Sequence, residues 1–99
     1  MKEIILTECS GFEWDEANCM KNFKKHGVSS LECEQVFFNT PLLMQEDSKH
    51  SALERRLYVL GKTDADRKLF IAFTMRNDQI RVISARDMSK QERRIYEQA

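Results

Sequence analysis

Residues 56–85, RLYVLGKTDADRKLFIAFTMRNDQIRVISA, decide the fold of this chain. β-Branched, aliphatic and aromatic residues gather there in runs with a period of two, which is typical of half-buried strands. The pattern predicts strands over Arg56–Gly61, Lys68–Thr74 and Ile80–Ala85. Short polar segments separate the runs, and turns of that length join antiparallel neighbours. The stretch therefore predicts an antiparallel meander.

Helix signals lie on both sides of this meander. Each is a side chain that can accept hydrogen bonds from the free N–H groups of a first helical turn. These side chains are Asp15, Ser29 and Ser89. The expected helices cover Glu16–His26, the segment from Ser29 to Pro41, and the segment from Ser89 toward Tyr96. With a further strand over Leu42–Gln45, we expect one α+β domain over residues 1–99, with one helical layer on an antiparallel sheet.

The composition fits a compact cytoplasmic domain. The chain has 99 residues, of which 41% are hydrophobic and 32% charged. Its longest apolar runs are far shorter than the roughly 18 residues of a membrane span, and no signal peptide is visible. The three cysteines fit neither a disulfide framework nor a C-x-x-C zinc pair, so we expect reduced thiols.

Charge is distributed unevenly along the chain. The 16 basic and 16 acidic residues cancel. Residues 1–50 nevertheless hold five Lys against nine acidic residues, and residues 51–99 hold eleven basic against seven acidic residues. All eight arginines belong to the second group, and guanidinium groups suit phosphate oxygens. The asymmetry favours an anion-binding surface in the folded protein.

Several short motifs form a specific combination. FEWD at 12–15, KHGVS at 25–29 and IRVISAR at 80–86 occur in this order, with an H-x-x-x-E-x-R segment that begins at His50. In this combination the chain resembles the BrnT family of bacterial type II toxins over residues 12–97. The resemblance implies a RelE-like fold, with a sheet of four to five strands packed against two N-terminal helices, and a C-terminal helix. A strand is also expected before the first helix, and the additional N-terminal residues Ile4–Thr7 could add to it.

The resemblance also implies an activity and partners. It implies a ribonuclease that cleaves RNA and inhibits translation. A BrnA-type antitoxin, a DNA-binding ribbon-helix-helix protein, would neutralise it in a hetero-oligomer. Contact with operator DNA would then occur only through the antitoxin, and no cofactor or membrane is implied.

Metal-independent RNA cleavage needs a base for the 2′-hydroxyl proton, cations for the developing phosphorane charge, and an acid for the leaving oxygen. The sequence offers candidates for these roles. They are Arg56, Arg76 and Arg81 for phosphate, Glu54 and His26 for proton transfer, and Lys25 and Tyr96 for orienting the RNA. A metal site is not expected, because His26 and His50 have no second histidine at ligand spacing.

The turn at Asn77-Asp78 sharpens this geometry. A two-residue loop would pair Thr74 with Arg81, so that Arg76 and Arg81 share one face of the sheet. Strict alternation would then place Ser84 and Arg86 on the face opposite Arg81.

Each candidate also has a purely structural interpretation. His26 could cap its helix, Glu54 and Arg56 could form a surface ion pair, and Arg76 and Arg81 could protect a strand end. Lys25 could be a solvated helix end, and Tyr96 could dock the last helix. A rival function is a non-catalytic adaptor that binds an acidic partner segment through the same arginines and assists operator repression.

Overall fold

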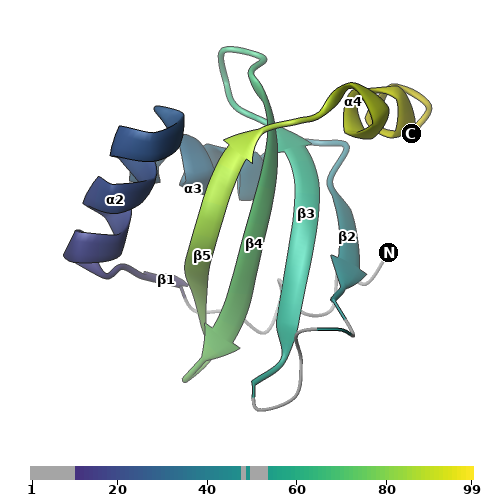
Figure 1. Cartoon of the computed structure of the whole chain (residues 1–99). Coiled ribbons are helices and arrows are strands. Elements are labelled where there is room, and N and C mark those ends of the chain that lie inside the picture. Colours follow the sequence, from purple (N-terminus) through teal and green to yellow (C-terminus); the bar gives the residue numbers. More distant parts are fainter. Residues whose placement is uncertain (1–10, 48, 50–53) are drawn as a thin grey trace.

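The computed structural model describes residues 11–47, 49 and 54–99, so Ile4–Thr7 and His50 lie outside the described residues. Figure 1 shows the helices and strands. They are β1 (Gly11–Glu13), α2 (Glu16–His26), α3 (Ser30–Phe38), β2 (Leu43–Glu46), β3 (Arg56–Lys62), β4 (Lys68–Arg76), β5 (Gln79–Asp87) and α4 (Lys90–Glu97). The expected helices and strands are present, and the α+β fold is confirmed. No helix in these ranges is long and apolar enough to cross a membrane.

The strands form one sheet with the order β1-β5-β4-β3-β2. The pairs from β2 to β5 are antiparallel, as the meander predicted. The expectation of a wholly antiparallel sheet is wrong at one edge, because β1 runs parallel to β5 and pairs Phe12 with Ile80. Five elements separate these two strands along the chain, so no tight hairpin fixes their relative direction.

The main core lies between α3 and one face of the sheet, with α3 behind the sheet in Figure 1. Alternate residues of the central strands supply it: Leu57, Val59, Leu69, Ile71 and Phe73. A Cβ atom on Gly61 would lie 2.6 Å from Cγ1 of Val36, so the missing side chain lets α3 approach β3 closely. Burial in this core raises the pKa of the Cys33 thiol to about 12, which makes it an inert packing group.

The last helix packs on the opposite face. Met88 and Tyr96 bury against Leu60, and Phe70 packs at the margin of this cluster. The Tyr96 hydroxyl donates a 2.6 Å hydrogen bond to the carbonyl oxygen of Pro41. The expected single helical layer is therefore wrong, because Leu60 and Phe70 give the second face an apolar patch of its own.

α2 lies beside β5 (Figure 1), and its asparagine side chains bond to the edge of that strand. The Asn22 side chain donates to the carbonyl of Ala85 and accepts from its N–H, both at 3.0 Å. Asn18 donates to the carbonyls of Val82 and Ile83. β1 pairs only with the first three residues of β5, so the two asparagines satisfy backbone groups of the remaining edge.

The helix ends match the sequence signals. Ser29 and Ser89 cap their helices as predicted, each in a capping box with the glutamate three residues later. The Asp15 side chain accepts from the N–H of Asn18 at 3.3 Å. Gly27 ends α2 with a φ of 67°, a left-handed conformation that favours glycine.

Arg67 joins α2, α3 and β5. Its guanidinium donates to both oxygens of Asp87 at 2.8 and 3.1 Å, and to Glu32 at 3.1 Å. It also donates to the carbonyls of His26 and Gly27, at 3.3 and 2.9 Å, which the end of α2 leaves without helical partners. The pKa of Asp87 is lowered chiefly by Arg67. That of Glu32 is lowered first by the backbone bond of its capping box and further by Arg67.

A bulge in β5 changes which side chains share a face. The residues on either side of Ile83 oppose consecutive residues of β4, so Ile83 is an extra residue in the ladder. Strict alternation is therefore wrong beyond this point. Ala85 returns to the main core, and Ser84 and Arg86 lie on the same face as Arg81.

Candidate active site

Two arginines flank a threonine in one row across the central strands. Arg56 of β3 pairs with Thr74 of β4, and Thr74 pairs with Arg81 of β5, as the two-residue turn predicted. Neighbouring strands are about 4.8 Å apart, so the two arginine backbones are about 10 Å apart. The face of the sheet that points away from α3 is called the open face below. It carries Arg56, Tyr58, Thr74 and Arg81. Thr74 is buried, and its hydroxyl donates to the carbonyl of Arg55 at 2.6 Å.

A third arginine and the candidate base lie beside this row. Arg76 is two residues beyond Thr74 and therefore on the open face, which it shares with Arg81 as predicted. Its Nε and Nη2 atoms donate to the carboxylate of Glu54 over 3.2 to 3.5 Å. The structure thus brings four candidate residues to one end of the open face: Glu54, Arg56, Arg76 and Arg81.

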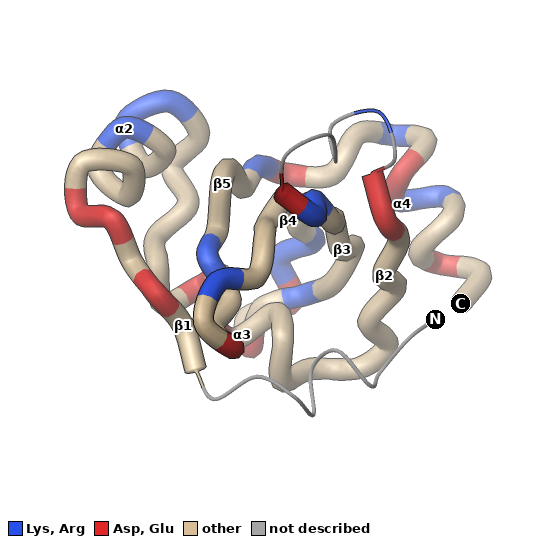
Figure 2. Tube along the Cα trace, turned by 90° about the horizontal axis from the view of Figure 1, so that it is seen from below, with Lys and Arg blue, Asp and Glu red and all other residues tan. Residues whose placement is uncertain are grey.

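Each of these three arginines lies near a carboxylate. The nitrogen–oxygen distances are 3.5 Å for Arg81 and Asp15, 4.0 Å for Arg56 and Asp47, and 3.2 Å for Arg76 and Glu54. Figure 2 looks onto this end of the sheet and shows basic and acidic segments close together. The side chains are between 25% and 46% exposed, and ion pairs of this kind contribute about 0 to 1 kcal/mol. A phosphate that accepts several charge-assisted bonds can therefore replace these carboxylates.

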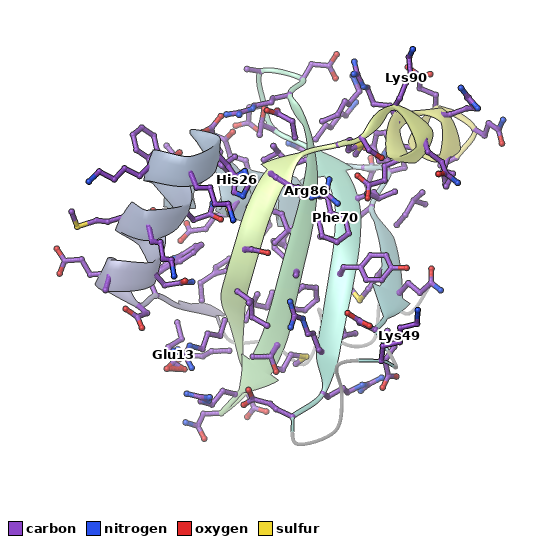
Figure 3. The ribbon with its side chains drawn as sticks, viewed as in Figure 1. Glu13, His26, Lys49, Phe70, Arg86 and Lys90 are labelled. Carbon is purple, nitrogen blue, oxygen red and sulfur yellow. The ribbon has the colours of Figure 1, made fainter. Side chains whose placement is uncertain are left out.

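The other candidate residues lie elsewhere. Lys25 and His26 are in the last turn of α2. α2 runs beside β5 toward Asp87, which places them about 20 Å along the strand from Arg81. Figure 3 shows His26 beside the upper part of the sheet. Tyr96 is only 4% exposed, which fits the role of docking the last helix.

The arrangement can bind a phosphate and hold a carboxylate next to it. The forks of Arg56 and Arg81 can donate to phosphate oxygens from two sides. Glu54, held by Arg76, is the candidate base at this end of the sheet. Within the described ranges, no three His, Cys, Asp or Glu side chains are grouped so that they could hold a metal ion.

Sequence reasoning missed an aromatic group on the open face. Tyr58 is two residues after Arg56, and its ring stacks on Phe70 with 5.3 Å between ring centroids. The Arg86 guanidinium lies 4.2 Å from the centroid of the Phe70 ring. The alternation of β3 is a signal that locates Tyr58 beside Arg56. The place of Arg86 depends on the bulge, which no residue pattern indicated.

A comparison with known protein families identifies the family of this chain. A family model described as "Ribonuclease toxin, BrnT, of type II toxin-antitoxin system" matches residues 14–92. The chain belongs to the BrnT family. Its fold is similar to the crystal structure of the Brucella abortus ribonuclease toxin BrnT, with a TM-score of 0.57 and 22% sequence identity. The match covers 81% of this chain and 97% of that chain.

A search of curated proteins finds no match. Family membership confirms the resemblance read from the sequence, and with it a place among the ribonuclease toxins of type II toxin-antitoxin systems. An antitoxin partner follows from that class of system.

Proposed function

We propose that this BrnT-family protein is a metal-independent endoribonuclease that acts in the cytoplasm and inhibits translation. The observation that carries the proposal is the placement of Arg56 and Arg81 on either side of Thr74, on one face of the sheet. Two guanidinium forks about 10 Å apart at the backbone can converge on one phosphate group. Neither arginine is buried, so RNA can reach both.

In the proposed reaction, the 2′-oxygen of the RNA forms a bond to phosphorus and the bond from phosphorus to the 5′-oxygen breaks. Glu54 takes the 2′-hydroxyl proton, and the departing 5′-oxygen takes a proton from solvent. Arg56 and Arg81 stabilise the charge that develops on the phosphorane oxygens. Arg76 positions the Glu54 carboxylate through its hydrogen bonds. Lys25, His26 and Tyr96 have no part in this proposal, because they lie away from these groups.

The decisive experiment compares RNA cleavage by purified wild type and Arg81→Ala in the presence of a chelator. A hydrogen bond to a charged group is worth about 1.5 to 3 kcal/mol, so we expect a loss of about 10- to 150-fold in kcat/KM. Arg94→Ala, an exposed change on α4, is the matched control and should leave cleavage unchanged. Undiminished cleavage by Arg81→Ala would remove this arginine from the site.

A second variant tests whether the neighbouring carboxylate competes with RNA. Asp15→Asn keeps a good helix cap but removes the charge that lies 3.5 Å from Arg81. We expect it to bind RNA more tightly than wild type, and weaker binding would contradict the proposed exchange of carboxylate for phosphate.

We further propose that the partner is a BrnA-type antitoxin, which covers the open face in a hetero-oligomer and carries the complex to operator DNA. Expression of this chain with and without a BrnA-type antitoxin gene tests the neutralisation. Growth arrest should occur only when the antitoxin gene is absent.

The adaptor function remains the second candidate, because each of the three arginines already lies near a carboxylate. An acidic partner segment would use the same contacts. Intact RNA together with measurable antitoxin binding would favour the adaptor, whereas metal-independent fragments with defined ends favour the ribonuclease.

A further inference from the structure

A groove of about 430 Å³ lies between α4 and the open face. Tyr58 and Phe70 line its sheet side, and Gln91 and Ile95 line its helix side. Sites for small ligands occupy about 300 to 1,000 Å³, so the groove can hold a flat ring. Figure 3 shows Phe70 and Arg86 on the sheet surface below α4.

The sheet side of the groove is a rigid aromatic platform. The rings of Tyr58 and Phe70 stack with an interplanar angle of 30°. Arg86 lies over Phe70 and is itself held by Glu92, through two hydrogen bonds of 2.8 and 3.0 Å. Tyr58 is half-buried and lines the groove, where a ligand can contact it. Stacking on such a ring is open to every base, because each base has a π face.

The platform adjoins the arginines of the open face. Tyr58 follows Arg56 by two residues on the same face of β3, a separation of about 7 Å. A ligand that suits both places carries a flat ring at one end and a negative group at the other, and a nucleotide has this form. The arginines beside the groove complement its phosphate.

The geometry points to a base-binding site, in which a nucleobase of RNA stacks on Tyr58 while its phosphate lies between Arg56 and Arg81. Gln91, exposed on α4, has an amide that can both donate to and accept from a base edge. This inference rests on the proposed function and adds the ring that holds a nucleotide beside the cleaved bond.

The test uses a short 2′-O-methyl RNA, which lacks the attacking 2′-hydroxyl and stays intact. Its affinity is measured for wild type, Tyr58→Ala and Tyr58→Phe. We expect Tyr58→Ala to weaken binding by about 5- to 150-fold, the usual effect of losing one stacked base, and Tyr58→Phe to stay close to wild type. Phe23→Ala, which removes a 56% exposed aromatic ring from α2, is the matched control and should have no effect.

An abasic position in the RNA provides the second arm. Scanned along the strand, one abasic substitution should weaken binding to wild type but not to Tyr58→Ala, because the variant has already lost that contact. Equal affinity of wild type and Tyr58→Ala overturns the inference, and so does the absence of binding to wild type. Loss of antitoxin binding alone in Tyr58→Ala would assign the groove to a protein and also overturn it.

Failure of the proposed ribonuclease activity would look different. Wild type would then bind the 2′-O-methyl RNA through Tyr58 and leave unmodified RNA intact. If unmodified RNA is cleaved but Tyr58→Ala binds the 2′-O-methyl RNA as tightly as wild type, the ribonuclease activity is supported and the base-binding site is rejected.

Discussion

Removing the Arg67 side chain should destabilise this protein and leave the arrangement of the open face unchanged. In Arg67→Ala, two backbone carbonyls at the end of α2 lose a donor, at about 0.5 to 1.5 kcal/mol each. The ion pairs with Glu32 and Asp87 are partly exposed and add about 0.2 to 1 kcal/mol each. The expected loss is about 3 kcal/mol in the free energy of unfolding, or roughly 12 to 24 °C in Tm for a domain of this size.

Thermal unfolding of purified protein at neutral pH, followed by circular dichroism, measures this loss. Arg67→Lys should fall between wild type and Arg67→Ala, because one ammonium group cannot reach all the acceptors of the guanidinium fork. Arg94→Ala controls for loss of an exposed positive charge. A decrease in Tm for Arg67→Ala no larger than for Arg94→Ala would refute the reasoning. Well below its Tm, Arg67→Ala should still cleave RNA, which separates a structural arginine from the arginines proposed to bind phosphate.

Three further outcomes are expected. The lowered pKa of Asp87 stabilises the fold above its ordinary value of 3.8, and this stabilisation is lost as the pH falls through the lower, folded-state pKa. Urea unfolding between pH 6 and about pH 3 should therefore show declining stability for wild type and a shallower decline for Arg67→Ala. Asn22→Ala leaves the backbone N–H and carbonyl of Ala85 without their side-chain partner. We expect the free energy of unfolding to fall by about 1 to 3 kcal/mol and the Ala85 amide to exchange hydrogen faster. Unchanged exchange would contradict the role of Asn22 at the edge of β5. Tyr96→Phe should lower stability by about 1 kcal/mol and leave growth arrest intact, whereas lost toxicity with unchanged stability would return Tyr96 to the RNA site.

The parts of the fold that the sequence predicted depend on neighbours along the chain. Helix caps, strand runs and the pairing of Thr74 with Arg81 are set by residues a few positions apart. The parallel pairing of β1, the side on which α4 packs and the bulge at Ile83 depend on contacts between distant segments. Local patterns carry no signal for such contacts.

The candidate site divides in the same way. Register and alternation brought Arg56, Arg76 and Arg81 to one end of the open face, because strand periodicity alone determines the face of each. The distance of His26 from these arginines follows from the way α2 lies against β5. Hydrogen bonds from two asparagine side chains fix that position, and no sequence motif predicted them. Tyr96 was placed on the correct helix, but its burial depends on the apolar patch around Leu60.

The extra residue in β5 has a consequence for comparing members of this family. Positions before and after Ile83 follow opposite odd-even rules, so a relative without the extra residue would keep its counterpart of Arg86 on the open face, but one position earlier in its sequence. An alignment that omits this one-residue gap would exchange core-facing and open-face columns over the second half of the strand. Relatives should therefore be superposed separately on residues 79–82 and 84–87 before their charged positions are compared.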